Sequence, residues 1–236
     1  MLSRDRIERL VEGTEADPFA VLGVHTKGKA LIARAWLPGA ESVHAETLAG
    51  KAVGDLARIH DAGLFEGDLS IRKRQPLRYV AHYAHGPDYR VVDPYSFGPV
   101  LGPMDDYYIG EGSHSRLFDK LGAHVIEHEG ATGTHFAVWA PNAQRVSVVG
   151  SFNHWDGRRH VMRRRLDTGI WEIFLPDVGA QEAYKYEIVG ADGSLLPLKA
   201  DPFAFQSELR PATASVVAPP PSHSWGDEAH MEHWAK

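Results

Sequence analysis

The chain contains the stretch Arg145-Val-Ser-Val-Val-Gly-Ser-Phe-Asn-His-Trp-Asp156. Its first five residues have the composition of a β-strand, and Gly150 to Asp156 carries the Gly, Ser, Asn and Asp residues of a turn. Two large aromatic residues, Phe152 and Trp155, lie within that turn. An exposed indole beside amide and carboxylate groups can stack on a sugar ring, whereas an inward indole would cover the core. The stretch alone leaves both interpretations open.

Short strands separated by Gly, Pro, Asp and His residues are expected on both sides of this stretch. In the second half they are Thr134 to Ala140, Arg145 to Val149, Ile170 to Leu175, Tyr184 to Val189 and Ala214 to Val217. In the first half they are Ala30 to Leu37, Val43 to Thr47, Phe65 to Ile71, Leu77 to Tyr83 and Tyr89 to Val92. Strands of this length and spacing indicate β-sandwiches, so we predict an all-β chain of two tandem immunoglobulin-like β-sandwiches.

The two halves resemble each other in order and spacing. Ala35-Trp-Leu-Pro38 matches Val138-Trp-Ala-Pro141, and Asp93-Pro-Tyr-Ser-Phe97 matches Asp201-Pro-Phe-Ala-Phe205. The repeat predicts a duplicated sandwich of about 100 residues. Because Trp36 and Trp139 are shared by both copies, we expect them in the cores.

The second copy also has residues that the first copy lacks. Trp155 and Asn153 have no counterpart in the first copy, and Lys185 aligns with Tyr79. Residues absent from one copy are not needed to build the fold, which favours a binding role for Trp155.

Outside the strands we expect helices and connecting segments. Ser3 to Glu12 is predicted to be a helix capped by Ser3 and ended by Gly13, and a short linker helix is predicted over Arg116 to Leu121. A last helix, capped by Ser224, is expected in the tail that carries Trp225, Met231 and Trp234. The expected division is residues 1–16 (helix), 17–105 (first sandwich), 106–125 (helical linker), 126–218 (second sandwich) and 219–236 (Pro-rich exit and tail).

Composition excludes several classes of partner. The net charge of -6 argues against nucleic acid, and there is no cysteine for disulfides or thiolate metal sites. The charged N-terminus lacks a signal peptide, and no apolar run approaches the roughly 20 residues of a membrane span. We therefore expect a cytoplasmic location with no membrane partner, and the sequence indicates no cofactor. The three tail histidines lack supporting carboxylates, so no metal is expected.

A binding surface can be drawn from the second copy. If Tyr184 and Tyr186 face the core, Lys185 points outward and can donate hydrogen bonds to hydroxyl oxygens. Together with Trp155 as platform and Asn153 beside it, Lys185 makes a shallow candidate site for a polyol. The alternative for Lys185 is an ordinary solvated lysine that pairs with Glu187 or Glu172.

No catalytic residue is predicted. The acidic pairs Asp105-Asp106 and Glu127-Glu129 lie on segments expected to be solvated, and a glycosidase needs two rigidly held carboxylates flanking the bond.

Several of these motifs together resemble a known family. Val146 to Trp155 resembles the starch- and glycogen-binding module that precedes the barrel in many α-amylase-family enzymes and that also occurs on the β-subunit of the AMP-activated kinase. Asp17 to His25, Asp93 to Phe97, Gly110 to His114 and Ala200 to Gln206 extend the resemblance to the N-terminal half of a bacterial 1,4-α-glucan (glycogen) branching enzyme.

The resemblance implies an activity that resides elsewhere. Enzymes of this family cleave an α-1,4 glucan and re-attach the piece through an α-1,6 bond, with catalytic residues in a (β/α)₈ barrel of about 250 residues. No catalytic residue carries over to this chain, which we expect to be inactive alone, as a truncated form or a fragmentary gene product. The expected partners are α-glucan, such as glycogen and malto-oligosaccharides, and the barrel.

The resemblance also assigns roles within the module. It makes Trp155 a sugar-stacking residue and Lys185 a hydrogen-bonding residue. The second stacking tryptophan, expected after Asp192-Gly193, is replaced by Ser194-Leu195, which implies weak affinity. The alternative is a free-standing glycogen-binding or scaffold protein with no catalytic domain.

Overall fold

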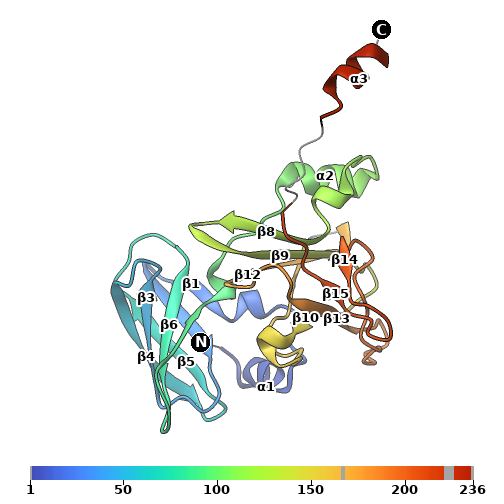
Figure 1. Ribbon diagram of the computed structural model, residues 1–236. Coiled ribbons are helices and arrows are strands. Elements are labelled where there is room, and N and C mark those ends of the chain that lie inside the picture. The colour runs from blue at the N-terminus through green and yellow to red at the C-terminus, as the bar shows by residue number, and fades with distance from the viewer. Residues whose placement is uncertain (1, 166–167, 221–225, 235–236) are drawn as a thin grey trace.

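The computed structural model describes residues 2–165, 168–220 and 226–234 of the 236-residue chain. Two β-rich halves lie side by side, joined by a short helical segment (Figure 1). All strand pairs with a recorded register are antiparallel. The predicted fold of two tandem immunoglobulin-like sandwiches with an N-terminal helix and a helical linker is confirmed.

The first half is one curled seven-stranded sheet in the order β1-β2-β5-β4-β3-β6-β7. Its strands are β1 (Gly23–Lys27), β2 (Ala30–Trp36), β3 (Ser42–Thr47), β4 (Ala52–His60), β5 (Leu64–Leu69), β6 (Leu77–His82) and β7 (Tyr89–Val92). Alternate residues of these strands, including Ala33, Val43, Phe65 and Tyr79, meet in one buried cluster. Strand β4 was not predicted, because register shifts at Ala45/Glu46 and at Arg58/His60 break its alternation.

The second half consists of two four-stranded sheets, β10-β13-β15-β14 and β11-β12-β9-β8. Their strands are β8 (Gly122–His128), β9 (Ala131–Trp139), β10 (Arg145–Gly150), β11 (Arg163–Arg165), β12 (Ile170–Pro176), β13 (Ala183–Val189), β14 (Gln206–Ser207) and β15 (Ser215–Val216). Phe136, Trp171, Tyr184 and Tyr186 are fully buried between these sheets. The predicted strands of this half are therefore present, and Tyr184 and Tyr186 face the core as expected.

The linker differs from the prediction. Helix α2 spans Pro103–Glu111, whereas the range predicted as helical contains only a single 3₁₀ turn, η3 (Leu117–Asp119). The signals for α2 were Pro103 at the first helical position and Gly112 with φ 74° at the end. Strand β8 already begins at Gly122, inside the range expected to be linker.

A buried carboxylate attaches this linker to the second half. Glu172, which is 2% exposed, accepts hydrogen bonds from the backbone N–H groups of Val100 and Leu101 at 3.1 and 3.0 Å. It also lies 3.1 Å from His135 Nε2 and 3.4 Å from Arg165 Nε. Burial of a carboxylate is compensated here by several donors, so Glu172 fixes the path of the chain into α2.

Helix α1 (Arg4–Glu12) is present as predicted, with Ser3 Oγ accepting from Arg6 N and Gly13 ending it at φ 74°. Its apolar face packs on the second half, where Leu10 joins the buried cluster. The Arg145 guanidinium donates to the Gly13 carbonyl oxygen. This bond joins the end of α1 to the first residue of β10, which lie 132 residues apart in the sequence.

The repeat has a structural basis at its two Asp-Pro motifs. Asp93 Oδ1 accepts from Tyr95 N at 3.1 Å, and Asp201 Oδ1 accepts from Phe203 N at 2.8 Å. The other oxygen of each carboxylate accepts from buried tyrosine hydroxyls: Tyr79 for Asp93, and Tyr184 and Tyr186 for Asp201. Burial raises the pKa of both carboxyls, that of Asp93 to about 7.

These contacts correct two predictions drawn from the repeat. The buried Tyr79 donates to Asp93 in the first sandwich, just as Tyr184 and Tyr186 donate to Asp201 in the second. The counterpart of Tyr79 in the second sandwich is therefore one of these inward tyrosines and not the outward Lys185. The core position expected for Trp139 is wrong, since this residue is 59% exposed. Phe136 and Val138 face inward, so alternation turns Trp139 outward; Trp36 is only partly buried.

The C-terminal segment ends in helix α3 (Glu228–Trp234), which Figure 1 shows apart from both sandwiches. A tail helix was predicted, although Ser224 and Trp225 lie outside the described residues. Met231 and Trp234 are exposed. Within the described part of the chain, no helix has the length and apolar character needed to cross a membrane.

Candidate functional site

The turn after β10 holds Trp155 at the surface. The chain forms a 3₁₀ turn, η4 (Ser151–Asn153), after which His154 and Trp155 both adopt left-handed backbone conformations, with φ 58° and 60°. Two consecutive non-glycine residues in this region are costly and persist only where the surroundings enforce them. Trp155 N donates to Gly150 O at 2.9 Å, which closes the turn. The Trp155 side chain is 40% exposed.

Asn153 is what enforces this geometry. It is only 1% exposed, and its Oδ1 accepts from Gly150 N at 3.0 Å. Its Nδ2 donates to Val148 O at 2.9 Å and to His160 Nδ1 at 3.0 Å. Burial lowers the pKa of His160 to about 4, so its imidazole is neutral and Nδ1 accepts a hydrogen bond.

Asn153, which was predicted to lie beside Trp155 in the site, is buried beneath the loop. Its amide is committed to three groups of its own chain, and it shapes the loop that presents Trp155. Of the three predicted site residues, Trp155 and Lys185 are the ones whose side chains reach the surface.

Position 150 needs a glycine because neighbouring atoms leave no space for a Cβ atom. A Cβ at this position would lie 2.5 Å from Ala183 O and 2.5 Å from Phe152 Cε1, and a backbone oxygen cannot yield as a flexible side chain can. The turn therefore starts at a position with no room for a side chain between β10 and β13, which further restricts the path of residues 151–155.

Lys185 lies at the same end of the β10–β13 ladder as Trp155. Lys185 pairs with Val149, and Tyr184 pairs with Gly150, the residue whose carbonyl binds Trp155 N. Because its neighbours Tyr184 and Tyr186 face the core, Lys185 points to the opposite face. Its Nζ donates to Thr213 Oγ1 at 2.7 Å.

The alternative of a Lys185 ion pair with Glu187 or Glu172 does not describe this structure. Glu187 pairs with Arg145, and Glu172 pairs with His135 and Arg165. An ammonium has three donors, so the bond to Thr213 orients the group and leaves donors for a ligand. Thr213 was not found from the sequence, because it lies 28 residues further along in a loop without a recognisable pattern.

The second surface position carries an aliphatic side chain. Gly193 turns the chain at φ 81°, and Leu195 forms an isolated bridge with Val189 of β13. Leu195 is 63% exposed on this sheet, where the resemblance to the kinase-type module leads one to expect a tryptophan. A leucine lacks the flat π-face of an indole, so it offers a weaker surface to a sugar ring.

Comparison with known families assigns each half. Residues 3–95 match the family model described as alpha-1,4-glucan branching enzyme GlgB, N-terminal domain. Residues 120–204 match the model described as carbohydrate-binding module 48 (isoamylase N-terminal domain). The chain corresponds to the N-terminal region of the glucan branching enzymes. Trp155 and Lys185 thus lie in the carbohydrate-binding module 48 half.

Curated relatives agree with this assignment. The chain is 72% identical over 228 residues to the 1,4-alpha-glucan branching enzyme GlgB of Mesorhizobium japonicum, covering 97% of this chain and 31% of that protein. It is 64% identical over 236 residues to that of Rhizobium meliloti, covering 100% of this chain and 32% of that protein. The chain spans about a third of the length of the curated relatives it matches.

The family assignment also bears on the alternative of a free-standing scaffold protein. The first half matches the model of the branching-enzyme N-terminal domain, beside the match of the second half to a carbohydrate-binding module, so that alternative is not favoured.

Proposed function

We propose that the carbohydrate-binding module 48 half binds linear α-glucan through Trp155 and Lys185. The observation that carries the proposal is the strained loop that holds the Trp155 indole at the surface, at the end of the ladder where Lys185 points outward. The indole stacks on the apolar face of a glucose ring, and the free donors of the Lys185 ammonium bind its hydroxyl oxygens. Asn153 contributes by fixing the loop.

The affinity of this surface should be low. One flat aromatic platform is present and Leu195 occupies the position of a second, so a bound glucan gains one stacking contact instead of two. We expect an exposed platform of this kind to leave most of the ligand in water. Several weak contacts along a branched polymer nevertheless add up through effective concentration, and glycogen should be retained better than a short oligosaccharide.

We further propose that the chain acts as the non-catalytic N-terminal part of a cytoplasmic 1,4-α-glucan branching enzyme of glycogen synthesis. That enzyme would cleave α-1,4 glucan and transfer the piece to an α-1,6 position, with the chemistry in a separate barrel. The two sandwiches, which we place at residues 17–105 and 126–218, would engage glucan and support that barrel. The 236-residue chain, incubated alone with amylose, should leave the iodine absorbance unchanged.

Sedimentation with glycogen tests the binding proposal. The wild-type chain should co-sediment with glycogen, and a clearly smaller fraction of Trp155→Ala should do so. Trp139→Ala is the matched control, because Trp139 is also a surface tryptophan of the same half and lies on β9, outside the candidate site. Equal loss in both variants, or retention of Trp155→Ala at the wild-type level, contradicts the proposal.

A further inference from the structure

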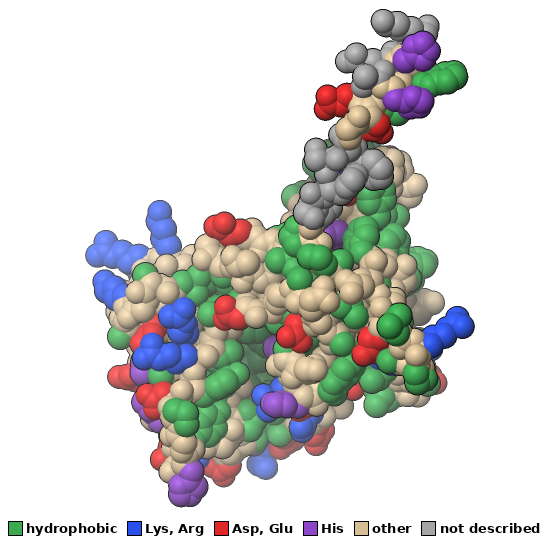
Figure 2. All heavy atoms as spheres, viewed as in Figure 1, with side chains coloured by type: hydrophobic (Ala, Val, Ile, Leu, Met, Phe, Trp, Pro, Cys, Tyr) green, Lys and Arg blue, Asp and Glu red, His purple; other side chains and the backbone are tan. Residues whose placement is uncertain are grey.

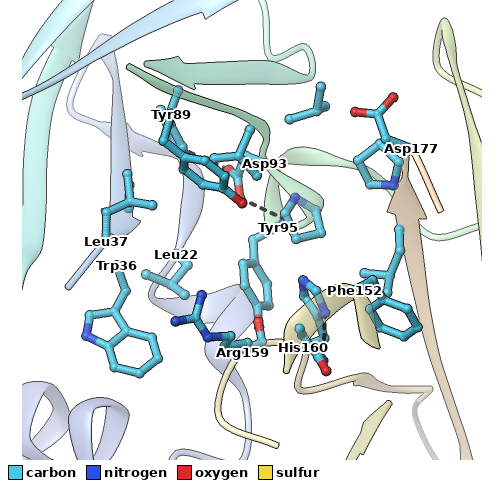
Figure 3. A pocket seen from close by; sticks show the side chains of 18 of the residues that line it. Leu22, Trp36, Leu37, Tyr89, Asp93, Tyr95, Phe152, Arg159, His160 and Asp177 are labelled. Carbon is cyan, nitrogen blue, oxygen red and sulfur yellow. Dashed lines mark hydrogen bonds between the residues drawn. The ribbon is translucent and has the colours of Figure 1, made fainter. Parts of the chain in front are cut away.

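A cleft of about 310 Å³ lies between the two sandwiches. Its first wall comes from the end of β2, from β7 and from the 3₁₀ turn η2 (Pro94–Ser96). Its second wall comes from the loop 151–160 and from residues 175–178, which are the end of β12 and the two residues after it. Figure 2 shows the surface hollowed between the two halves, and Figure 3 shows the side chains that line the hollow.

Aromatic rings line opposite sides of this cleft. In Figure 3, Trp36 and Tyr89 stand on one side and Phe152 on the other, with Tyr95 between them. Trp36 is held in place, since its Nε1 donates to Ala62 O at 3.1 Å. Tyr95 is fixed as well, because its hydroxyl donates to Arg159 O at 2.9 Å and accepts from Val161 N at 3.2 Å. Tyr89 lies on the edge strand and is 50% exposed.

Hydrogen-bonding groups surround these rings. His160 Nδ1 accepts from Asn153, so the neutral ring carries its proton on Nε2, which has no protein partner among the described residues. Asp177 follows β12 in an exposed turn with φ 62°. Arg159 lies at the cleft with a side chain 46% exposed.

The charges around the cleft are of both signs, since Arg34, Arg90 and Arg159 line it together with Asp93 and Asp177. Arg34 is paired with Glu66 at 2.8 Å, and Arg159 lies 3.6 Å from Asp156. Asp93, at the base, is committed to Tyr79 and Tyr95. Fixed aromatic faces with a neutral imidazole donor and a free carboxylate acceptor match the two sides of a sugar: apolar C–H faces and a rim of hydroxyl groups.

We propose that this cleft binds a short segment of linear α-glucan, as a second site separate from the Trp155 surface. The proposal rests on the proposed function, because it assumes that the ligand of the chain is α-glucan. The volume is at the lower end of the range for ligand sites, about 300–1,000 Å³, which suits a few sugar units and excludes a folded partner.

The two sites share one loop. Residues 151–160 present Trp155 outward, while Phe152 and His160 face the cleft. Asn153 bonds both Gly150 at the start of this loop and His160 at its end. The cleft site is therefore built from both halves of the chain, whereas the Trp155 surface belongs to the second half alone.

Amide chemical shifts of the ¹⁵N-labelled chain, titrated with maltotriose, test the proposal. The amides of residues 89–92 report on the cleft, and those of Lys185 and Thr213 report on the Trp155 surface. Both groups should shift in the wild type. Tyr89→Ala removes one aromatic face and should weaken the cleft titration about fivefold while sparing Lys185 and Thr213. Trp155→Ala should abolish the shifts at Lys185 and Thr213 and leave residues 90–92 responsive.

Tyr107→Ala is the matched control for Tyr89→Ala. Tyr107 is 56% exposed on α2, outside both sites, and its replacement should change neither titration. If residues 89–92 do not respond to maltotriose while Lys185 and Thr213 do, the cleft proposal is overturned and the proposed function stands. A cleft titration unaffected by Tyr89→Ala also overturns it. If neither group responds, both proposals fall.

Discussion

Replacing Asn153 with alanine should lower the stability of the second half, because Asn153 holds the loop that presents Trp155. The side chain is buried and bonds Gly150 N, Val148 O and His160 Nδ1. Its removal leaves two buried backbone groups without these partners, and each such group costs about 1–3 kcal/mol. We expect the free energy of unfolding to fall by about 3 kcal/mol.

Urea unfolding followed by tryptophan fluorescence and circular dichroism measures this change. With a slope of about 2 kcal/mol/M, the midpoint of the second half should drop by about 1.5 M. Asn142→Ala is the control, because Asn142 is an exposed turn asparagine of the same half and its loss should stay within about 0.5 kcal/mol. An unchanged midpoint for Asn153→Ala refutes the assignment of the loop to these hydrogen bonds.

Three further changes test other parts of the structure. Leu195→Trp places a flat ring at the exposed second position and should tighten maltoheptaose binding about three- to tenfold by calorimetry; a weaker complex would mean that this position does not face the ligand. Asp93→Asn tests the buried carboxyl, whose folded pKa of about 7 exceeds the unfolded value near 3.8. The folded state then binds the extra proton, so wild-type stability should fall relative to the variant as pH rises from about 4 to about 7; a difference that is constant with pH contradicts the raised pKa. Glu172→Ala leaves His135 and two linker N–H groups without their partner and should cost about 3–5 kcal/mol in urea unfolding; a loss below 1 kcal/mol would show that the linker is held by other contacts.

The strands were predictable where one face is buried and the period of two is intact. Tyr184 and Tyr186 alternate with Lys185, and the structure keeps that alternation. Strand β4 has two register shifts and few buried side chains, so its residues carry no such pattern. The error at Trp139 has a different origin, because the prediction followed its match to Trp36 in the repeat and not its alternation with Val138.

Of the candidate site, the sequence predicted the outward direction of Lys185, which the structure shows, but not the burial of Asn153. An asparagine in a turn can face solvent or bond the backbone, and composition does not distinguish the two; burial shows that Asn153 does the second. The Lys185–Thr213 contact and the cleft depend on pairings between distant segments. Helix α1 likewise has clear caps in the sequence, yet its docking on β10 is set by Arg145, which no local pattern reveals.

The most direct test of the account is the indole N–H spectrum of the chain during addition of maltoheptaose. The sequence has six tryptophans, and the spectrum of Trp155→Ala identifies the Trp155 signal by its absence. The account predicts that this signal moves saturably with ligand, while the signal of the buried Trp171 stays in place. A Trp155 signal that does not move in a folded chain, at ligand concentrations that saturate any other binding, contradicts the claim that Trp155 is the glucan platform.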